Sequence, residues 1–495
     1  MRPILEYCAY LIFLSGMYLK KLKIRNFRCF PQYEVELAPR VTVLFGKNGT
    51  GKTTLIHAIH KALSFMMYSE RIKEKDPETG KMKVVGSHSV VKGNPYLHVE
   101  GYTKQGDVYD INDPLVEIDA VAQLDNTIPP LFWAISAYSD KLVLRYSEFR
   151  EAFREFYQWH QETDELPLLC FISDSFPHKE DLQHRLLKQK ISDYRSFGYY
   201  NWNGESGNTK EWVGRLENEM READRIERKI RILEHMARNL SVHGESDNDA
   251  YKDLMRGIEV EKEKIKVYEA EITIIENVLR RFTRQLLVEG GQYLEVASLG
   301  LHPEDDKLCV NTTKGEVKRF RNLPAGYKRL FCIVLELAFR SYLLNPQSGT
   351  DSKGVAIIDE IDLHLHPELE KVALTRLVET FPNLQFIVST HSPMVLSGLN
   401  TSNGENVILQ LVSNQPMPYK CPDVYGLDYN SVVQEIMNVG ASDPELQHLI
   451  SRCAYLYKNN FVEQGNALKQ QMIERGLLSQ AALEQRIEKA MRDLM

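Results

Sequence analysis

The sequence predicts an α/β fold that is interrupted by an antiparallel pair of long helices and followed by an all-helical C-terminal domain. Continuous apolar runs such as VTVLF, GVAIID and LQFIVST are typical of buried parallel strands. Apolar residues at heptad spacing across residues 223–286 predict the helix pair, and the polar helical pattern after residue 425 predicts the last domain. At 495 residues the chain exceeds the about 250–300 residues of one ordinary core, so we expect at least two domains.

Composition and charge exclude several classes of protein. The chain is 43% hydrophobic and 26% charged, which excludes collagen-like, mucin-like and wholly disordered sequences. Its formal net charge is −7, so we expect nucleic acid to bind only through a local basic patch. Seven scattered cysteines without a CxxC pair are typical of a reducing compartment, without a disulfide framework or structural zinc. We therefore expect a cytoplasmic protein, and no membrane partner, because no stretch approaches the about 20 apolar residues of a membrane span.

The N-terminal part begins with strands and then changes to a helix. Residues 3–14 are apolar but contain Glu6 and lack a clear cleavage site, so we interpret residues 1–17 as an extension, with translation starting at Met1 or Met17. Residues 18–45 alternate as two or three strands, and helical spacing follows their glycine-rich turn. We place the domain boundaries at 1–17 (N-terminal extension), 18–208 (first α/β lobe), 209–289 (helical hairpin), 290–424 (second α/β lobe) and 425–495 (helical C-terminal domain).

Two long helices are predicted between the α/β lobes. The polar break SVHGESDND contains Gly244 and would reverse the chain, so the helices would pair as an antiparallel coiled coil with arms of about 45–55 Å. An ordinary helical subdomain packed on a core is the alternative. The apolar positions are Ala223, Ile226, Ile230, Leu233, Ala237 and Leu240 in the first helix, and Leu254, Ile258, Ile265, Tyr268, Ile272, Ile275, Leu279, Phe282 and Leu286 in the second, where Glu261 interrupts the pattern.

The glycine-rich turn matches the phosphate-loop pattern GxxxxGK[ST] at every defined position. An apolar strand enters the turn and the helix TLIHAIHKAL leaves it, which is the context that this motif requires. Glycines let backbone N–H groups converge on phosphate oxygens, and the helix N-terminus adds a favourable dipole. We expect Lys52 to reach the β- and γ-phosphates of ATP and the Thr53 hydroxyl group to ligate Mg²⁺. The predicted nucleotide-binding residues of this turn are Gly46, Lys47, Asn48, Gly49, Thr50, Gly51, Lys52, Thr53 and Thr54.

A second apolar strand, VAIIDE, ends in the acids Asp359 and Glu360. A carboxylate at the end of a buried strand is costly unless it meets a cation or hydrogen-bond donors. We expect Asp359 to complete the Mg²⁺ shell with Thr53, and Glu360 to act as general base toward the water that attacks the γ-phosphate. The alternative is a pair of solvated acids at a strand end.

Histidines follow both of the later buried strands. His391 ends the next buried strand, in STHSP, and parallel pairing with the strand that ends in the two acids would bring it near the γ-phosphate. We therefore predict that His391 is catalytic, together with Lys52 and Glu360. His364 and His366 alternate like metal ligands in DLHLHP, but we interpret them as residues that shape the turn, with metal binding as the alternative.

The order of these motifs resembles the ABC-type P-loop ATPase heads of the RecF, SMC and OLD group. The resemblance covers roughly residues 18–412 and rests on the phosphate loop, the helical insertion, LPAGYKR, VAIIDE, IDLHLHP and STHSP, with LKIRNFRCF similar to the group's first strand. It implies that Asn26 and Arg28 approach the nucleotide base. It also implies head-to-head homodimers that sandwich ATP between the phosphate loop of one chain and the signature segment of the other. The signature residues expected at the site are Leu323, Ala325, Gly326, Tyr327 and Lys328.

The chain departs from the group's pattern in three places. Pro324 stands where the signature usually has serine, so a hydroxyl donor to the γ-phosphate is missing, although Gly326 keeps an N–H and Lys328 or Arg329 could add charge. A helix-capping loop is the alternative interpretation of LPAGYKR. The Q-loop glutamine is not identifiable, and Gln123 and the ISAYSDK stretch are only candidates. The hairpin lacks the CxxC tip of zinc-hook repair ATPases, which excludes joining of tips through zinc.

Within the group, the length, the short hairpin and the helical tail resemble the PtuA-like ATPase subunit of Septu anti-phage systems, including versions associated with retrons. Residues 400–495 lack the acidic nuclease motifs of OLD proteins, and no HNH-like set is visible. The resemblance therefore implies a separate HNH-like nuclease subunit, DNA or retron nucleic acid as a further component, and slow ATP hydrolysis that gates the nuclease. We interpret the tail after Tyr425 as the docking surface for this nuclease or as a cap on the sheet edge.

Two other functions stay open at the level of sequence. An ATP-stabilised scaffold that barely hydrolyses ATP would fit Pro324, whereas an intact Glu360 favours hydrolysis. A DNA-repair ATPase that acts directly on DNA would need a basic surface. The compact basic cluster near the phosphate loop lies on the first strand, whose alternation would divide it between two faces. This cluster consists of Lys20, Lys21, Lys23, Arg25 and Arg28.

Overall fold

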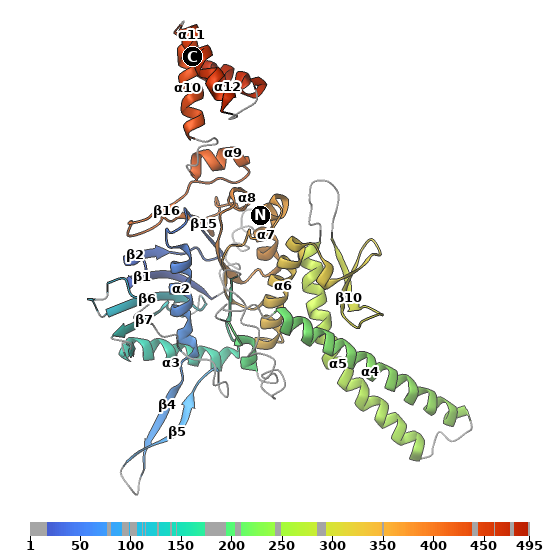
Figure 1. Cartoon of the computed structure of the whole chain (residues 1–495). Coiled ribbons are helices and arrows are strands. Elements are labelled where there is room, and N and C mark those ends of the chain that lie inside the picture. The colour runs from blue at the N-terminus through green and yellow to red at the C-terminus, as the bar shows by residue number, and fades with distance from the viewer. Residues whose placement is uncertain are drawn as a thin grey trace, which may run out of the picture. The chain divides into compact units, whose positions relative to one another are not determined.

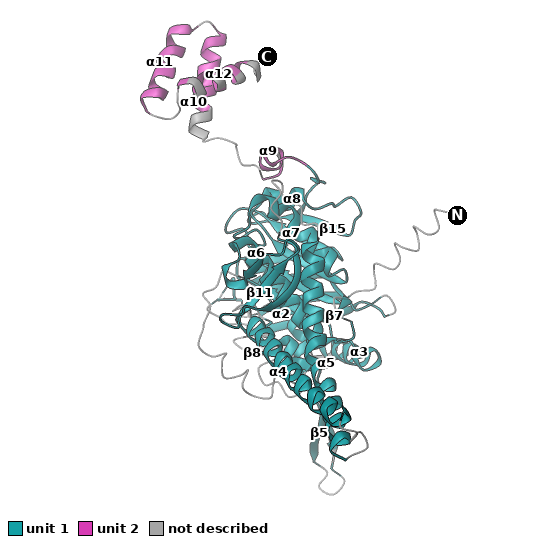
Figure 2. Cartoon of the chain, turned by 90° about the vertical axis from the view of Figure 1, so that its right-hand side faces the viewer, with its two compact units in different colours: residues 1–426 teal, residues 427–495 magenta. Residues whose placement is uncertain are grey.

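The computed structural model forms two compact units, residues 1–426 and 427–495, which are coloured separately in Figure 2. The predicted N-terminal extension up to residue 16, the Gly244 break and two residues of ISAYSDK lie outside the described residues. The structure describes residues 17–76, 81–91, 99, 106–110, 112–113, 115–125, 128–138, 141–144, 146–173, 195–202, 209–242, 249–284, 294–348, 351–437, 444–459, 461–475 and 480–493.

The larger unit is built on a six-stranded sheet in the order β16-β15-β3-β14-β13-β9, in which all neighbours except β16 and β15 are parallel. Every residue of β3, β13 and β14 is buried, as expected for a parallel sheet that is covered on both faces. The register pairs Ile358 with Val388 and Ser389 with Leu44, so β13, β14 and β3 end at the same edge. The strands are β3 (Val41–Phe45), β9 (Leu168–Ile172), β13 (Gly354–Ile358), β14 (Leu384–Ser389), β15 (Asn406–Gln410) and β16 (Tyr419–Lys420).

A five-stranded antiparallel sheet lies on one side of helix α2 (Lys52–Leu63). Trp133 of this sheet donates from Nε1 to the carbonyl oxygen of Ala62 at 2.9 Å and stacks on Phe65. On the other side of α2, the ring of His60 contacts Phe171 of β9. Helix α2 is therefore held between the two sheets. The antiparallel strands are β1 (Tyr18–Phe27), β2 (Phe30–Glu36), β6 (Leu115–Gln123), β7 (Leu131–Tyr138) and β8 (Lys141–Leu144).

Further elements surround the two sheets, and Figure 1 shows α2 with the antiparallel strands to the left of α6 and α7. The helices are α3 (Tyr146–Thr163), α6 (Ala325–Leu344), α7 (Pro367–Thr380) and α8 (Pro393–Ser397). Three-residue to five-residue 3₁₀ turns occur at Ser64–Met67, Arg195–Tyr199 and Phe320–Asn322. A three-stranded sheet contains β10 (Val296–Leu301), β11 (Leu308–Thr312) and β12 (Val317–Arg319), and a two-stranded hairpin contains β4 (Glu70–Lys75) and β5 (Met82–His88).

Two long helices, α4 (Thr209–Val242) and α5 (Asp249–Thr283), pack side by side and form the long arm that Figure 1 shows. Their shared apolar core contains Ile226, Ile230, Ala237, Ile258 and Ile265, all of which belong to the heptad positions seen in the sequence. Glu261 interrupts this core but accepts hydrogen bonds from Lys229 at 2.8 Å and Lys264 at 3.0 Å, which lower the pKa of its carboxyl group. Paired in this way, a charged side chain is tolerated between apolar ones.

The base of this arm is fixed to α6. The indole of Trp212 in α4 stacks on Phe339, with ring centroids 5.2 Å apart, and its Nε1 donates to the Glu336 carboxylate. Arg340 is 0% exposed; it pairs with Glu336 and donates to the carbonyl oxygen of Gly198 at 2.7 Å. Since a buried charge must be paired and hydrogen-bonded, this network holds α4 and α6 in one arrangement.

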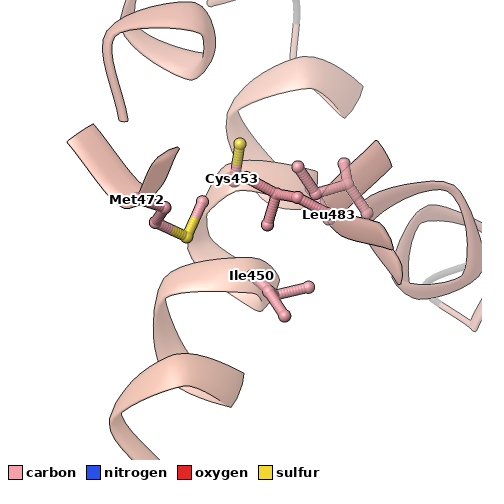
Figure 3. Close-up of a cluster of buried hydrophobic side chains, with 6 residues drawn as sticks. Ile450, Cys453, Met472 and Leu483 are labelled. Carbon is pink, nitrogen blue, oxygen red and sulfur yellow. The ribbon is translucent and has the colours of Figure 1, made fainter. Parts of the chain in front are cut away.

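All secondary-structure elements described in the smaller unit are helical. Its elements are α9 (Tyr429–Ser431), a π-helical turn (Val432–Ile436), α10 (Pro444–Lys458), α11 (Val462–Glu474) and α12 (Gln480–Asp493). Figure 3 shows its core, in which Ile450 and Cys453 of α10 meet Met472 of α11 and Leu483 of α12. These side chains are at most 6% exposed, so the three helices share one small core of their own.

Among all the helices described in both units, none combines the length and the apolar character that crossing a lipid bilayer would require.

Candidate functional site

The glycine-rich turn after β3 adopts a conformation that demands glycine at two positions. Gly46 has a φ of +152° and Gly51 a φ of +100°. A Cβ atom at Gly46 would lie 2.5 Å from the carbonyl oxygen of Leu411, and one at Gly51 would lie 2.6 Å from the ring of Phe30. Both the backbone conformation and the space therefore exclude other side chains. A backbone without side chains here can approach phosphate oxygens closely.

Helix α2 begins directly behind this turn, at Lys52. The Lys52 ammonium group donates to the carbonyl oxygens of Gly46 at 2.8 Å and Lys47 at 3.2 Å, so it lies across the turn. Burial lowers the pKa of Lys52, while nearby carboxylates, Asp359 foremost, oppose that shift. The N-cap residue is Gly51, which has no side chain to cap the first-turn N–H groups, and no acid occurs in the first turn. The positive end of the helix is therefore suited to an anion.

The other residues of the predicted phosphate loop surround this position. Thr50 is buried and donates from Oγ1 to the carbonyl oxygen of Lys47 at 2.9 Å, which closes the turn. Lys47, Asn48 and Gly49 are exposed, and Thr54 is half-buried in the first turn of α2. The loop thus presents an open outer side and a fixed inner side.

Three segments that are far apart in sequence converge on Asp359. This residue follows β13 and is 1% exposed. One carboxylate oxygen accepts a hydrogen bond from the hydroxyl group of Ser389, the last residue of β14, and the other accepts from Thr53 Oγ1 at 3.4 Å. The structure thus brings the two predicted metal-ligating residues together. A buried carboxylate and a hydroxyl group are oxygen ligands of the kind that Mg²⁺ prefers, and hydroxyl groups rather than basic side chains hold Asp359, so the residues fit a divalent cation.

Glu360 occupies a left-handed backbone conformation, with a φ of +53°. Its N–H donates to Ser389 Oγ at 2.8 Å, and its carbonyl oxygen accepts from Arg329 at 3.2 Å. A left-handed non-glycine residue costs of the order of 1–3 kcal/mol and persists only where its surroundings hold it. These contacts from β14 and α6 fix the backbone that carries the half-buried Glu360 side chain.

His391 lies two residues beyond β14 and is exposed. Its backbone N–H donates to Asp362 Oδ1 at 3.3 Å, and the same carboxylate accepts from Thr390 Oγ1 at 2.6 Å. The segment after β14 is therefore tied to the turn after β13, and His391 lies at the sheet edge where Asp359 lies. These contacts involve the backbone of His391, so a catalytic role for its ring stays a prediction.

The predicted signature segment forms the start of α6. Leu323 is buried, and Pro324 is the N-cap residue with an extended backbone. Ala325 and Lys328 are exposed, and Gly326 is half-buried. The first turn of α6 therefore presents both backbone and charge at the surface, and its role toward a partner's nucleotide stays a prediction.

The inner side of the signature segment contacts the turn that carries the acids. A Cβ atom at Gly326 would lie 3.3 Å from the carbonyl oxygen of His364. Burial, with Glu368 nearby, raises the pKa of Tyr327. Arg329 is 7% exposed and donates to the carbonyl groups of the two acids rather than facing outward. The suggestion that Arg329 adds charge to the signature surface is therefore wrong, because its guanidinium group is buried and donates to the carbonyl groups of Asp359 and Glu360.

The turn between β1 and β2 lies beside the phosphate loop, since Phe30 is the neighbour that a Cβ atom at Gly51 would meet. The amide of Asn26 donates to the carbonyl oxygens of Asp110 and Asp113 before β6 and of the first residue of β6. Arg28 donates from Nε to Asp107 Oδ1 at 2.9 Å. Both side chains thus hold a neighbouring segment in place, and their approach to a nucleotide base stays a prediction.

Gln123 does not lie near the phosphate loop. It pairs with Tyr18 at the start of β1, whereas Phe27 at the other end of β1 leads into the turn beside Gly51. Ten strand residues separate these ends, a distance of about 30 Å. The Gln123 amide also donates to the carbonyl oxygens of Asp125 and Ile128, so it stabilises its own turn. The structure argues against Gln123 as the Q-loop residue.

His364 and His366 shape the segment before α7. His364 has a left-handed φ of +63°, and His366 is the N-cap residue of α7, whose Nδ1 accepts from the N–H of Glu368 at 3.5 Å. Within the described ranges, no group of three or more His, Cys, Asp or Glu side chains is arranged to hold a metal ion.

Comparison with known proteins assigns the family. The sequence model of the AAA ATPase domain matches residues 17–396, which include the phosphate loop, both acids and His391. The chain belongs to the AAA ATPase domain family. The match extends across the helical arm and ends before the smaller unit.

Relatives of this AAA ATPase domain protein include proteins of two named kinds. The Retron Vc95 probable ATPase of Vibrio cholerae serotype O1 biovar El Tor is 24% identical over 79% of this chain and 74% of its own length. The Septu protein PtuA of Bacillus mycoides is 29% identical over 28% of this chain and 20% of its own length. The Smc head domain of Pyrococcus furiosus, solved with the C-terminal domain of ScpA, gives a TM-score of 0.39 at 17% identity over 82% of this chain and 96% of that one. The predicted resemblance to retron-associated and Septu ATPases is confirmed.

Two residues of this ATPase site were not singled out from the sequence. Ser389 contacts both Asp359 and the backbone of Glu360, and Asp362 holds the segment that carries His391. Both lie inside motifs that drew attention through other residues, STHSP and IDLHLHP. For Ser389 the sequence did offer a signal, because it is a polar residue at the end of a buried strand next to the strand that ends in the acids.

Proposed function

We propose that this chain is a nucleotide-dependent switch that binds ATP with Mg²⁺ at residues 46–54 and hydrolyses it slowly. The observation that carries the proposal is the convergence of Thr53 and Ser389 on the buried Asp359 carboxylate, beside the Lys52 ammonium group. Thr53 and Asp359 would hold Mg²⁺, which when bound neutralises charge on the β- and γ-phosphates. Phosphoryl transfer needs positioning and charge stabilisation, and this arrangement can supply both.

The roles of the protein groups follow from where they lie. Lys52 already lies across the loop and would exchange its two carbonyl contacts for phosphate oxygens. The N–H groups of the loop and of the first turn of α2 would bind the same phosphates. The Glu360 carboxylate would orient the attacking water and accept its proton. His391, at the same edge of the sheet, would face the γ-phosphate.

Two substitutions test binding and hydrolysis separately. Lys52→Ala should abolish retention of labelled ATP in a filter assay, whereas Lys371→Ala, at an exposed lysine of α7, should leave retention unchanged. Glu360→Gln should keep ATP bound but reduce phosphate release by at least about tenfold, as expected for loss of a general base. Unchanged retention in Lys52→Ala would refute the nucleotide site. Equal phosphate release by Glu360→Gln and wild type would replace the hydrolytic switch with an ATP-binding scaffold.

We further propose that two copies of this chain form a head-to-head dimer with ATP between them. The exposed first turn of α6, which contains Ala325 and Lys328, would meet the γ-phosphate bound by the other copy. A site completed only in the dimer would couple the nucleotide state to the oligomeric state. Light scattering after chromatography should show a dimer for Glu360→Gln with ATP and a monomer for Lys328→Glu under the same conditions. A Glu360→Gln protein that stays monomeric with saturating ATP would overturn the dimer.

The biological role that we propose is defence against phage in the cytoplasm. The proteins named Retron Vc95 probable ATPase and Septu protein PtuA support this role as relatives. The dimer would gate a separate HNH-like nuclease, with DNA or retron nucleic acid as a further component. The α4–α5 arm would act as an antiparallel coiled coil, and the smaller unit would dock the nuclease. Phage plating on cells with wild-type protein, Lys52→Ala or Glu360→Gln tests the role, and mass spectrometry of proteins that co-purify with the tagged chain tests the partner. Equal phage resistance with all three proteins would contradict it.

A further inference from the structure

The β4–β5 hairpin is a two-stranded ribbon whose strands pair only with each other among the described strands. Figure 1 shows it below α3, extending away from the two sheets of the larger unit. Its base is fixed by Glu70, which pairs with Arg154 of α3 at 2.7 Å, and by His88, whose ring stacks on Tyr157 at 4.7 Å. An isolated two-stranded ribbon has little stability of its own, so a ribbon that extends into solvent invites a functional explanation.

One face of this ribbon carries cations and no described acid. The register places Arg71 opposite Ser87 and Lys73 opposite Val84, with a register shift of the pairing between Ile72 and Lys73. Residues that lie directly opposite each other in an antiparallel pair point to the same side, and alternate residues along a strand share a side. The cations of β4 thus form one row beside exposed apolar residues of β5. We call this side the basic face.

The opposite face of the ribbon has balanced charge. Glu74 lies opposite Lys83. Asp76 lies opposite Lys81, and the backbone N–H of Asp76 donates to the carbonyl oxygen of Lys81 at 2.8 Å. Glu74 and Asp76 therefore each have a lysine directly across the ribbon, and Glu70 on the same side pairs with Arg154. The two faces belong to the same hairpin, so the register of the strands, and not the overall composition of the hairpin, separates the charges.

The basic face is open to solvent. Arg71 and Lys73 are exposed, Met82 is 61% exposed and Val84 is 50% exposed. The salt bridges that the structure contains in its described part join neither Arg71 nor Lys73 to an acid. An unneutralised row of cations with apolar neighbours is suited to a polyanion that also offers apolar surface.

The basic cluster that the sequence offered on β1 has a different environment. Four of its five members pair with acids of adjacent segments, which leaves little net charge there to attract a polyanion. The pairs are Lys21 with Glu34 and Glu36, Lys23 with Glu34, Arg25 with Asp113 and Glu117, and Arg28 with Asp107.

We propose that the basic face of the β4–β5 ribbon binds the phosphate backbone of a double-stranded nucleic acid. A two-stranded ribbon fits the width of the major groove of a duplex. From Arg71 to Lys73 the strand spans about 7 Å, a length of duplex axis that carries about four phosphate charges. An anionic membrane would instead favour a larger basic cluster together with Trp, Phe or Leu, which this face lacks.

The ionic contacts make the salt dependence of binding a quantitative readout. With two contacts, from Arg71 and Lys73, the slope of log affinity against log salt concentration is expected to be about −1.8, so affinity should fall about 12-fold between 50 and 200 mM salt. Removal of both contacts should remove the contribution of this face to the salt dependence. Binding should show little preference for base sequence, because phosphate contacts carry no sequence information.

The test uses fluorescence anisotropy of the full-length chain with a labelled 30-base-pair DNA duplex, a duplex RNA of the same length and a single strand. The variant Arg71→Gln/Lys73→Gln removes two charges from the basic face. The matched control Lys81→Gln/Lys83→Gln removes two charges from the opposite face of the same ribbon. Both variants should keep the thermal unfolding midpoint and the ATP retention of the wild type, since the changed side chains are exposed.

The proposal would be supported if the slope of log affinity against log salt concentration became about two units less negative in Arg71→Gln/Lys73→Gln and stayed unchanged in the control. The comparison of DNA with RNA would identify which duplex binds. Equal effects of the two variants would overturn it, because net charge rather than the basic face would then drive binding. Failure of the wild type to bind either duplex would also overturn it. Binding to vesicles of anionic phospholipid in place of a duplex would assign this face to a membrane instead.

Discussion

Replacing Ser389 by alanine should lower both the rate of ATP hydrolysis and the free energy of unfolding. The hydroxyl group donates to the buried Asp359 carboxylate and accepts the N–H of Glu360 at 2.8 Å. Its loss removes a hydrogen bond to a charged group, worth about 1.5–3 kcal/mol, and leaves a backbone N–H without its side-chain partner. We expect the free energy of unfolding to fall by about 2–4 kcal/mol. Freed from β14, Glu360 should lose its orientation, and kcat for ATP should fall about 10-fold to 100-fold, which corresponds to about 1.4–2.8 kcal/mol.

The assay is phosphate release at saturating ATP and Mg²⁺, combined with denaturant unfolding of the same preparations. Ser397→Ala is the matched control, because Ser397 is 1% exposed and its hydroxyl group makes only a neutral contact of 3.3 Å with the carbonyl oxygen of Met394. The control should lose about 0.5–1.5 kcal/mol of stability and keep its phosphate release. If Ser389→Ala releases phosphate within about twofold of the wild type, then Ser389 does not orient the acids and the reasoning fails.

Three further changes test other parts of the structure. Gly51→Ala should weaken binding of fluorescent ATP at least about tenfold, because its Cβ atom would lie 2.6 Å from the ring of Phe30 at a φ of +100°. The control Gly404→Ala is strained at a φ of +75° but has no neighbour within 4 Å, so it should bind ATP normally. Equal binding by the two variants would contradict the clash. Burial raises the pKa of Glu219 in α4 to about 9, so the folded carboxyl group keeps a proton that the unfolded chain releases above about pH 4.5, and stability falls as pH rises between these values. The melting temperature of Glu219→Gln should therefore exceed that of the wild type by more at pH 8 than at pH 5. A difference that does not change with pH would contradict this. Leu483→Ala should destabilise the core of the smaller unit by about 2–5 kcal/mol and make it sensitive to protease while ATP retention persists, so simultaneous loss of both would argue against two separate cores.

The phosphate loop and the acidic strand were predictable because their information is local. Gly46, Gly51 and Lys52 occupy fixed positions in one short segment, and the strand before it and the helix after it can be recognised from periodicity alone. The meeting of Asp359 with Thr53 was also predictable in outline, since parallel strands that end in polar residues share an edge.

What could not be predicted depends on contacts between distant segments. The hydroxyl group of Ser389 matters because β14 lies between β3 and β13, an order that no single segment specifies. Arg329 turns inward because α6 packs beside the turn of the acids, although its place in the sequence was equally compatible with the surface. Gln123 lies at the far end of β1 because of the antiparallel register, which the spacing of glutamines along the chain does not reveal.

The network at the base of the helical arm gives α6 a mechanical role. Helix α6 begins with the exposed turn at Ala325 and, further along, carries Glu336 and Phe339, which contact Trp212 of α4. Helix α4 has 34 residues, so it extends about 50 Å. The arm is therefore attached, through Trp212, to the same helix whose first turn is the predicted signature segment.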